Sequence, residues 1–343
     1  MSRLILLCGD RGTGVAAHVE ATALAVDDEG LSVATIDVDD CGGDAAALSA
    51  VAAVFDATLG ELGAEAMPPE AWSALPGVAD LGALLAIAQA TADHDVVVVD
   101  AGDPRRAREL VTLPSVLLRV LGQALTPRMA MWRPAGAVQQ PFDVLSAARL
   151  TVLRLEGMLQ RPSTTMRLIA RPDTADVDRV LRAGAAIAML GVGVDGYIVA
   201  PFPRSSDGEK ARRRADRLLA GFSESAEGVL VWKSTRIARP VPKGRSAVGP
   251  LGRVHVLDEQ QVTVVADDEE FTLDVPLAAP ARREARIGTV DGRLVVAFDG
   301  STRWLDLPPV LQRCTPVDAV RTSSGVRIAF RPDPAVWPSK EAS

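Results

Sequence analysis

Apolar, strand-length runs alternate with helix-length stretches through the first 238 residues, and this alternation constrains the fold more than any other feature of the sequence. The runs are rich in Val, Ile and Leu, and they cover Leu4–Leu7, Val33–Asp37, Val96–Asp100, Arg167–Ala170 and Tyr197–Ala200. Between them, stretches such as Leu81–Ala92 and Val144–Leu159 have helical spacing. Alternating buried strands and helices form a parallel sheet covered on both faces. We therefore expect an α/β domain over residues 1–238.

The pattern changes after a segment rich in Pro and Gly. Arg239–Gly252 is the predicted linker, because these residues interrupt both helices and strands. Beyond it, short segments alternate apolar and polar residues with a period of two: RVHVL, QVTVVAD, EFTLDVPL, EARIGTV, RLVVAFDG and GVRIAF. Asp291-Gly292 and Asp299-Gly300 are typical of hairpin turns. We predict a small all-β sandwich at residues 253–331 and a flexible, Pro-rich tail at residues 332–343.

Charge and cysteine usage exclude several classes of function. The formal net charge of -7 gives no general attraction to nucleic acid, so no nucleic-acid partner is expected. Cys8, Cys41 and Cys314 show no C-x-x-C spacing, so neither a disulfide framework nor a cysteine metal site is predicted. No apolar run is long enough to cross a bilayer, and the start reads as a strand rather than a signal peptide. We expect a cytoplasmic protein without a membrane span.

A glycine-rich loop follows the first predicted strand and precedes an Ala-rich helix, which is where a phosphate-binding loop belongs. Gly9, Gly12 and Gly14 let the backbone approach an anion. A working Walker A loop also needs Lys after the last Gly, to neutralise phosphates, and then Ser or Thr to hold Mg²⁺. Val15 and Ala16 occupy those places. The sequence therefore predicts a phosphate-binding loop that has lost its cation and its hydroxyl.

Further segments, in the expected order, resemble the ArsA family of P-loop ATPases, which includes arsenite-pump ATPases and ATPases that deliver tail-anchored membrane proteins. The matching segments are Pro76–Leu81 (P-G-x-x-E-L), His94–Pro114 (strand, switch and helix), Thr164–Asp173 (strand and P-E motif) and Gly191–Ala200 (V-D-G-V-V-x-N). Leu273–Pro276, Gly292–Val296 and Arg303–Pro308 resemble an α-crystallin-like domain found in some bacterial members. The resemblance implies a P-loop NTPase fold, with ATP and Mg²⁺ as the family's cofactors.

The same resemblance shows where this chain departs from the family's nucleotide site. The family carries a signature Lys directly after the first Gly, and Asp10 stands there. A carboxylate about 4 Å from a phosphate charge costs about 4 kcal/mol at an effective dielectric of 20, so Asp10 opposes binding. Ala200 replaces the Asn that contacts adenine, and Ala101–Arg106 replaces the switch that senses the γ-phosphate. ATP and Mg²⁺ are therefore not expected as cofactors, although the fold is retained.

Three carboxylates keep positions that the family uses. Asp37 and Asp39 match the D-x-D after the second strand, and Asp100 matches the carboxylate at the end of the third. We expect a vestigial site of Gly9, Gly12, Gly14, Asp37 and Asp100, in a pseudo-ATPase that acts through protein contacts. The family's dimers suggest a homodimer or a heterodimer with an ArsA-like homologue. Ser115–Ala137, rich in Leu and Met, is where targeting-type relatives bind hydrophobic client segments, although helical apolar stripes of this kind are more often buried in a core or a dimer interface.

Two alternatives remain open. The chain can be an atypical ATPase, in which Arg11, Arg105 or Arg106 replaces the missing Lys while Asp39 and Asp100 serve catalysis. It can also be a dinucleotide-binding module, because Gly12-x-Gly14-x-x-Ala17 matches that fingerprint and Asp37 ends the second strand.

Other polar clusters carry weaker signals. His18, His94 and His255 share no metal-ligand spacing. The run Glu209–Arg217 (EKARRRADR) is the strongest local basic cluster. On a helix it exposes several Arg to solvent or to an acidic partner.

Overall fold

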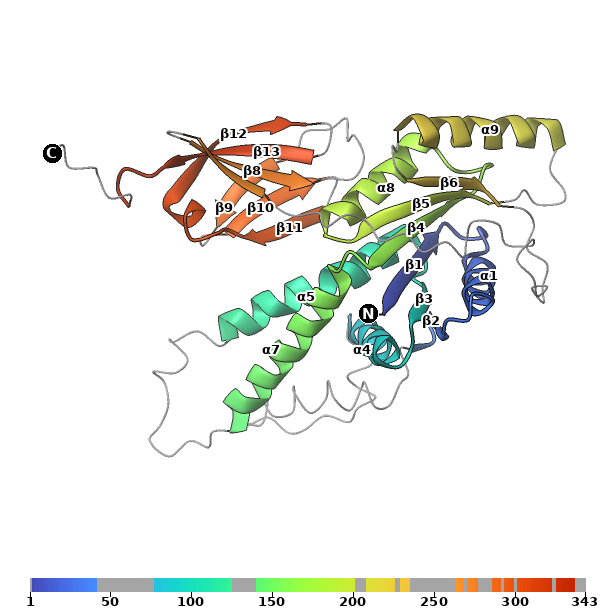
Figure 1. Cartoon of the computed structure of the whole chain (residues 1–343), viewed down its shortest axis with the longest axis horizontal. Coiled ribbons are helices and arrows are strands. Elements are labelled where there is room, and N and C mark those ends of the chain that lie inside the picture. The colour runs from blue at the N-terminus through green and yellow to red at the C-terminus, as the bar shows by residue number, and fades with distance from the viewer. Residues whose placement is uncertain are drawn as a thin grey trace.

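The computed structural model of the chain describes residues 2–41, 77–124, 140–200, 208–225, 229–234, 263–267, 270–276, 286–290, 293–298, 301–322 and 325–336. The predicted linker, the strand predicted at residues 253–257, the two Asp-Gly turns and residues 337–343 of the predicted tail lie outside these ranges. The described residues form a parallel α/β domain and an antiparallel β domain (Figure 1).

The α/β domain is built on a six-stranded parallel sheet with the order β2-β3-β1-β4-β5-β6. Its strands are β1 (Arg3–Gly9), β2 (Val33–Asp37), β3 (Val96–Asp100), β4 (Thr164–Ala170), β5 (Gly193–Val199) and β6 (Leu230–Lys233). The first five confirm the predicted strands. The sixth was not predicted, because its four residues, LVWK, are too few to show a period. The predicted parallel α/β domain is confirmed, and its sheet is consistent with a P-loop NTPase-like fold.

Helices cover the sheet unequally. They are α1 (Val15–Asp27), α4 (Val78–Asp93), α5 (Pro104–Ala124), α7 (Gln140–Leu159), α8 (Val177–Met189) and α9 (Gly208–Ser225). In β1, Leu4, Leu6 and Cys8 join the core that includes all helices except α1, whereas Ile5 and Leu7 pack toward α1. Because both faces are covered, β1 is apolar from Leu4 to Cys8, as the sequence predicted.

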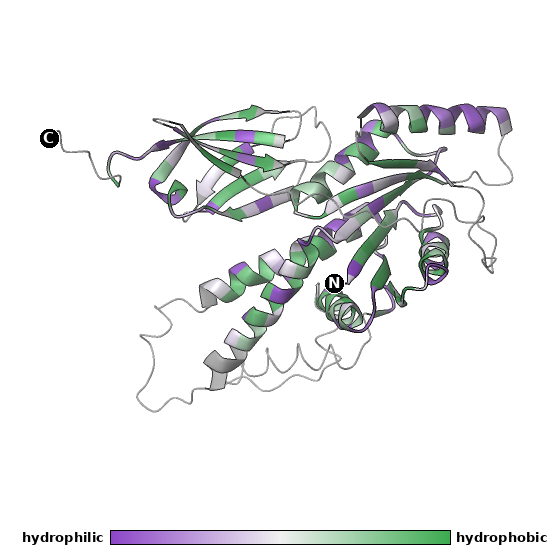
Figure 2. Ribbon diagram, in the orientation of Figure 1, coloured by the Kyte–Doolittle hydropathy of each residue, from purple (hydrophilic) through white to green (hydrophobic). Residues whose placement is uncertain are grey.

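Two helices extend beyond the sheet. α5 and α7 pack side by side and project away from the body of the domain (Figure 1). The strands of the sheet are dominated by hydrophobic residues, whereas α9 is largely hydrophilic (Figure 2). No helix within the described ranges is both long and apolar enough to span a bilayer.

The C-terminal domain is a sandwich of two antiparallel sheets. One has the order β12-β13-β8-β7 and the other β11-β10-β9. The strands are β7 (Thr263–Asp267), β8 (Glu270–Pro276), β9 (Arg286–Val290), β10 (Arg293–Phe298), β11 (Ser301–Asp306), β12 (Cys314–Arg321) and β13 (Gly325–Pro332). Leu273 and Phe330 of the first sheet share one buried core with Leu294 and Val296 of the second. The predicted all-β sandwich is confirmed.

The sandwich packs directly on the α/β domain through α8. Ala185 and Met189 of that helix belong to the buried core of the sandwich, whereas Ile187 and Ala188 belong to the core of the parallel sheet. Arg119 of α5 stacks over the ring of Trp304 on β11, 3.6 Å from its centroid. α8 therefore contributes to both cores.

A fully buried ion pair joins two strands of the parallel sheet. Arg167 on β4 donates from Nη2 to Asp195 Oδ2 on β5 at 2.9 Å, and from Nε to both carboxylate oxygens at 3.1 Å. Neither side chain is exposed. A buried pair of this kind is costly to break, because the remaining charge is left without compensation.

Candidate functional site

The segment between β1 and α1 forms a tight loop at the carboxyl edge of the sheet. β1 ends at Gly9, and α1 begins at Val15 with Gly14 as its N-cap residue. Gly12 and Gly14 have positive φ values of 81° and 76°, which residues with a Cβ rarely adopt. Free N–H groups at a helix start favour anions. The tight turn that the glycines predicted is therefore present, and its role in binding phosphate stays a prediction.

The side chains at this loop do not fit a magnesium nucleotide. Val15 and Ala16 open α1, and neither supplies a cation or a hydroxyl group. Ala200 directly follows β5 and is buried, with its N–H donating to the carbonyl of Ala170 at 2.8 Å. A methyl group there offers no hydrogen bond to a base.

Asp10 is paired within the chain. Its Oδ1 lies 3.1 Å from Nη2 of Arg179, a residue in the first turn of α8. The two residues are 169 positions apart in the sequence, so the fold alone brings them together. The pair neutralises the carboxylate, and it also occupies a guanidinium that stands close to the loop.

A second guanidinium, that of Arg171 directly after β4, also contacts the loop. Arg171 donates from Nη1 to the carbonyl of Arg11 at 3.2 Å. A side chain at Gly12 would collide with this guanidinium. Arg171 also pairs with Asp173 through Nε, at 2.9 Å, and through Nη2, and the Arg171 guanidinium holds the pKa of Asp173 below its usual value. Arg171 and Arg179 therefore each have a carboxylate partner already.

A small cavity of about 290 Å³ lies between the loop and the starts of α5 and α8. It is lined by Asp10, Asp103, Pro104, Arg105, Leu168, Ile169, Arg179, Val180 and Ala183. Two carboxylates and two guanidinium groups balance each other in this lining. Its volume falls just below the 300–1,000 Å³ range of typical small-molecule sites. Neither its size nor its charge favours a nucleotide.

The predicted carboxylates gather at the same edge of the sheet. Asp100 lies opposite Asp37 on β2 and opposite Leu7 on β1. Asp100 Oδ1 accepts from the N–H of Gly102 at 3.0 Å, and Asp37 Oδ1 accepts from the N–H of Asp39 at 2.9 Å. Burial raises the pKa of Asp100, and the neighbouring carboxylates raise it further. Nowhere in the described ranges do three or more His, Cys, Asp or Glu residues form a metal-binding group.

Two of the three arginines considered as substitutes for the missing Lys, Arg105 and Arg106, form ion pairs with carboxylates. Arg106 Nη2 lies 3.0 Å from Asp80 Oδ1 on α4 and 3.6 Å from Asp39 Oδ1. Burial raises the pKa of Asp80, and the Arg106 guanidinium opposes this increase. Arg105 Nε lies 2.9 Å from Glu109 Oε1 within α5. The Arg106 pairs link the start of α5 to α4 and to the turn that follows β2.

Sequence reasoning missed the role of His18, which hydrogen-bonds to the last residue of the loop, Gly14, and to Ser234 after β6. Its Nδ1 donates to the carbonyl of Gly14 at 2.8 Å, and its Nε2 lies 2.9 Å from Ser234 Oγ. The ring is 2% exposed, and burial lowers the pKa of His18. The neutral ring therefore accepts at Nε2 from the Ser234 hydroxyl. No local signal reveals this contact, because the two residues lie 216 positions apart.

The order of the sheet distinguishes this site from a dinucleotide site. In the dinucleotide fold the order is 3-2-1-4-5-6, so the second strand and its ribose-binding carboxylate lie beside the first. Here β3 separates β2 from β1. Asp37 therefore lies one strand, about 4.8 Å, farther from the loop than that fold requires.

Comparisons with known proteins identify relatives of this chain. No family model matches it. The uncharacterized protein SCO2128 of Streptomyces coelicolor is 30% identical over 304 residues, which cover 81% of this chain and 76% of that protein. Protein Rv2184c of Mycobacterium tuberculosis is 24% identical over 308 residues, covering 79% of this chain and 72% of its own length.

Among solved structures, the signal recognition particle receptor FtsY from Elizabethkingia anophelis matches with 13% sequence identity and a TM-score of 0.31. The match covers 72% of this chain and 63% of the receptor chain, which is less than two thirds of its length.

Proposed function

The chain belongs to the same family as the uncharacterized protein SCO2128 of Streptomyces coelicolor, and we propose that it is an ArsA-like pseudo-ATPase, which does not hydrolyse nucleotide and acts through protein contacts. The observation that carries this proposal is the ion pair of Asp10 with Arg179 beside a loop whose following helix begins with Val15.

Electrostatics support the first half of the proposal. A phosphate group at the loop would have to compete for Arg171 and Arg179, because Asp173 pairs with Arg171 and Asp10 pairs with Arg179. Binding would require the phosphate to displace a carboxylate from a guanidinium, and the displaced carboxylate would then repel it. Losing the hydroxyl at Ala16 removes the contact that holds Mg²⁺ in P-loop enzymes.

Exposed apolar side chains support the second half. Val116 and Val120 on α5 are 43% and 57% exposed, and Leu150 and Leu153 on α7 are 58% and 43% exposed. We call these four residues the α5–α7 surface. Val116 and Val120 are one turn apart on α5, Leu150 and Leu153 are one turn apart on α7, and exposed apolar groups on neighbouring helices are a feature of protein interaction sites. The proposed partner is a second P-loop NTPase-like chain, either another copy of this chain or an ArsA-like homologue.

One alternative has an observation in its favour. Because Arg171 and Arg179 both lie beside the loop, an atypical ATPase could use them in place of the missing Lys. This reading needs each arginine to exchange its carboxylate for a phosphate. It predicts nucleotide binding that depends on both arginines.

Calorimetric titration with ATP, with and without Mg²⁺, tests the proposal. We expect no magnesium-dependent, saturable binding by the wild-type chain. Saturable binding that is lost in both Arg171→Gln and Arg179→Gln would establish the atypical ATPase reading instead. Arg182→Gln on α8 is a control, because the Nε of Arg182 donates to a backbone carbonyl of its own helix rather than to the loop.

A further inference from the structure

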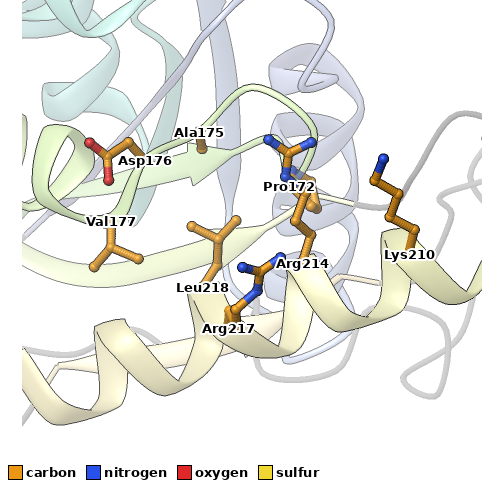
Figure 3. A pocket seen from close by; sticks show the side chains of 8 residues that line it. All are labelled: Pro172, Ala175, Asp176, Val177, Lys210, Arg214, Arg217 and Leu218. Carbon is orange, nitrogen blue, oxygen red and sulfur yellow. The ribbon is translucent and has the colours of Figure 1, made fainter.

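A second cavity, of about 520 Å³, lies between the start of α8 and helix α9 (Figure 3). Asp176 and Val177 line it from the segment that opens α8, and Lys210, Arg214, Arg217 and Leu218 line it from α9. In Figure 3 the basic side chains project from α9 toward the segment that precedes α8. None of these residues lines the cavity at the phosphate-binding loop.

Lys210, Arg214 and Arg217 form one row on α9, which we call the basic stripe. They recur at positions i, i+4 and i+7, so they share a helix face. With a rise of 1.5 Å per residue, the stripe runs about 10 Å along the helix axis. The positive charge is therefore distributed along a line and does not converge on one point.

The carboxylates near the stripe have other partners: Asp173 interacts electrostatically with Arg214, but it is paired with Arg171. Two of the acidic residues of α9 are used elsewhere, because Glu209 pairs with Arg213 and Asp216 lies 3.0 Å from Lys233 Nζ. Within the described ranges, no residue of the basic stripe forms an ion pair, and Arg217 Nε donates only to a backbone carbonyl, at 3.4 Å. Asp176 is the one carboxylate among the residues that line the cavity. In a chain with a net charge of -7, this groove is a local concentration of positive charge.

Two further features suit an anionic ligand with an apolar part. The N-cap residue Asp176 makes no side-chain cap hydrogen bond, so the first N–H groups of α8 remain available to an acceptor. Val177 and Leu218 supply an apolar floor between the cations. Leu218 is 4% exposed, so its position is fixed by the core.

We propose that the groove between α8 and α9 binds an acidic segment of a partner protein. The segment places carboxylates along the basic stripe and one apolar side chain over Val177 and Leu218. Glutamates at i, i+4 and i+7 of a helix, or carboxylates about three residues apart in an extended chain, match the 10 Å stripe. A single phosphate group reaches only part of it. The site is independent of whether the phosphate-binding loop binds nucleotide.

Fluorescence anisotropy with a short fluorescein-labelled peptide of glutamates around a single leucine tests the proposal. The wild-type chain should bind this peptide, and binding should weaken as salt rises. A matched peptide with glutamine in place of glutamate should not bind. Arg214→Gln combined with Arg217→Gln should weaken binding at least about tenfold. Arg212→Gln, on the same helix but outside the cavity lining, should have little effect, and Asp176→Asn should tighten binding.

Each substituted side chain is exposed, so thermal unfolding should be unchanged and loss of binding can be assigned to the groove. The proposal is wrong if the glutamate and glutamine peptides bind equally, or if Arg212→Gln weakens binding as much as the double variant. It is also wrong if pyrophosphate binds through the stripe while the acidic peptide does not.

Discussion

Asp10, directly after β1, and Arg179, in the first turn of α8, form an ion pair of 3.1 Å beside the phosphate-binding loop. The pair ties the loop, which has Val15 where P-loop enzymes have Lys, to the guanidinium of Arg179. Because the pair balances these two charges inside the chain, we propose that the loop attracts anions weakly despite its backbone form. This relationship underlies the proposed absence of ATP hydrolysis.

Rebuilding the loop should restore nucleotide binding if its backbone form is intact. In the triple variant Asp10→Lys, Val15→Lys and Ala16→Thr, the carboxylate is removed and two cations and a hydroxyl are introduced. We expect it to bind magnesium ATP at least about tenfold more tightly than the double variant Val15→Lys and Ala16→Thr, which retains Asp10. Calorimetry measures both affinities. Equal affinities would show that Asp10 does not oppose phosphate.

Protonation of His18 should destabilise the fold. Burial lowers the pKa of His18 below its ordinary 6.5, so the unfolded chain binds its proton more readily than the folded chain. The contribution is fully present above pH 6.5, and stability should fall as the pH drops below that value. Denaturant unfolding of the wild type between neutral and mildly acidic pH measures this slope. His18→Gln should reduce the slope, and a slope in His18→Gln equal to that of the wild type would refute the assignment.

The Arg167–Asp195 pair should be among the most sensitive polar contacts of the sheet. Asp195→Asn leaves the guanidinium of Arg167 buried without its countercharge, which should cost about 3–5 kcal/mol. Asp274→Asn is the matched control, because Asp274 pairs with Arg327 on the exposed face of the sandwich. That change should cost less than about 1 kcal/mol. Denaturant unfolding of both variants decides the point, and equal losses would contradict the account.

The α5–α7 surface should carry a protein contact. Val120→Glu and Leu150→Glu change exposed side chains, so the stability of the monomer should change by less than about 0.5 kcal/mol. Light scattering over a range of concentrations should show that the variants lose self-association, or capture of the homologous partner. Val317→Glu, on an exposed position of β12, should retain it. If the Val120 and Leu150 variants associate like the wild type, the contact lies elsewhere; if instead they lose only binding of an apolar client peptide, the surface is a client site.

Local sequence patterns predicted the elements of the fold well. Val96–Asp100 is apolar up to its last residue, which is the pattern of a central parallel strand, and the structure has β3 there. Gly12 and Gly14 predicted a tight turn, and both have positive φ. The strand β12 was missed because Pro316 interrupts its alternation, at the place where its pairing with β13 also shifts register.

The contacts that define the site could not be predicted locally. Arg106 was considered as a phosphate ligand, yet its carboxylate neighbours, Asp80 and Asp39, lie on other elements. The partner of Asp10 lies 169 positions away. Helical spacing in α8 also gave no indication that Met189 faces the β sandwich, because an apolar face packs equally well on a sheet or on a second domain.

Phosphate release from ATP in the presence of Mg²⁺ tests the central claim most directly. The account predicts that the wild-type chain releases no more phosphate than the buffer alone, and no more than the Asp100→Asn variant. Magnesium-dependent release by the wild type that disappears in Asp100→Asn, and also in Arg179→Gln, would contradict it and would show that the loop is catalytically competent.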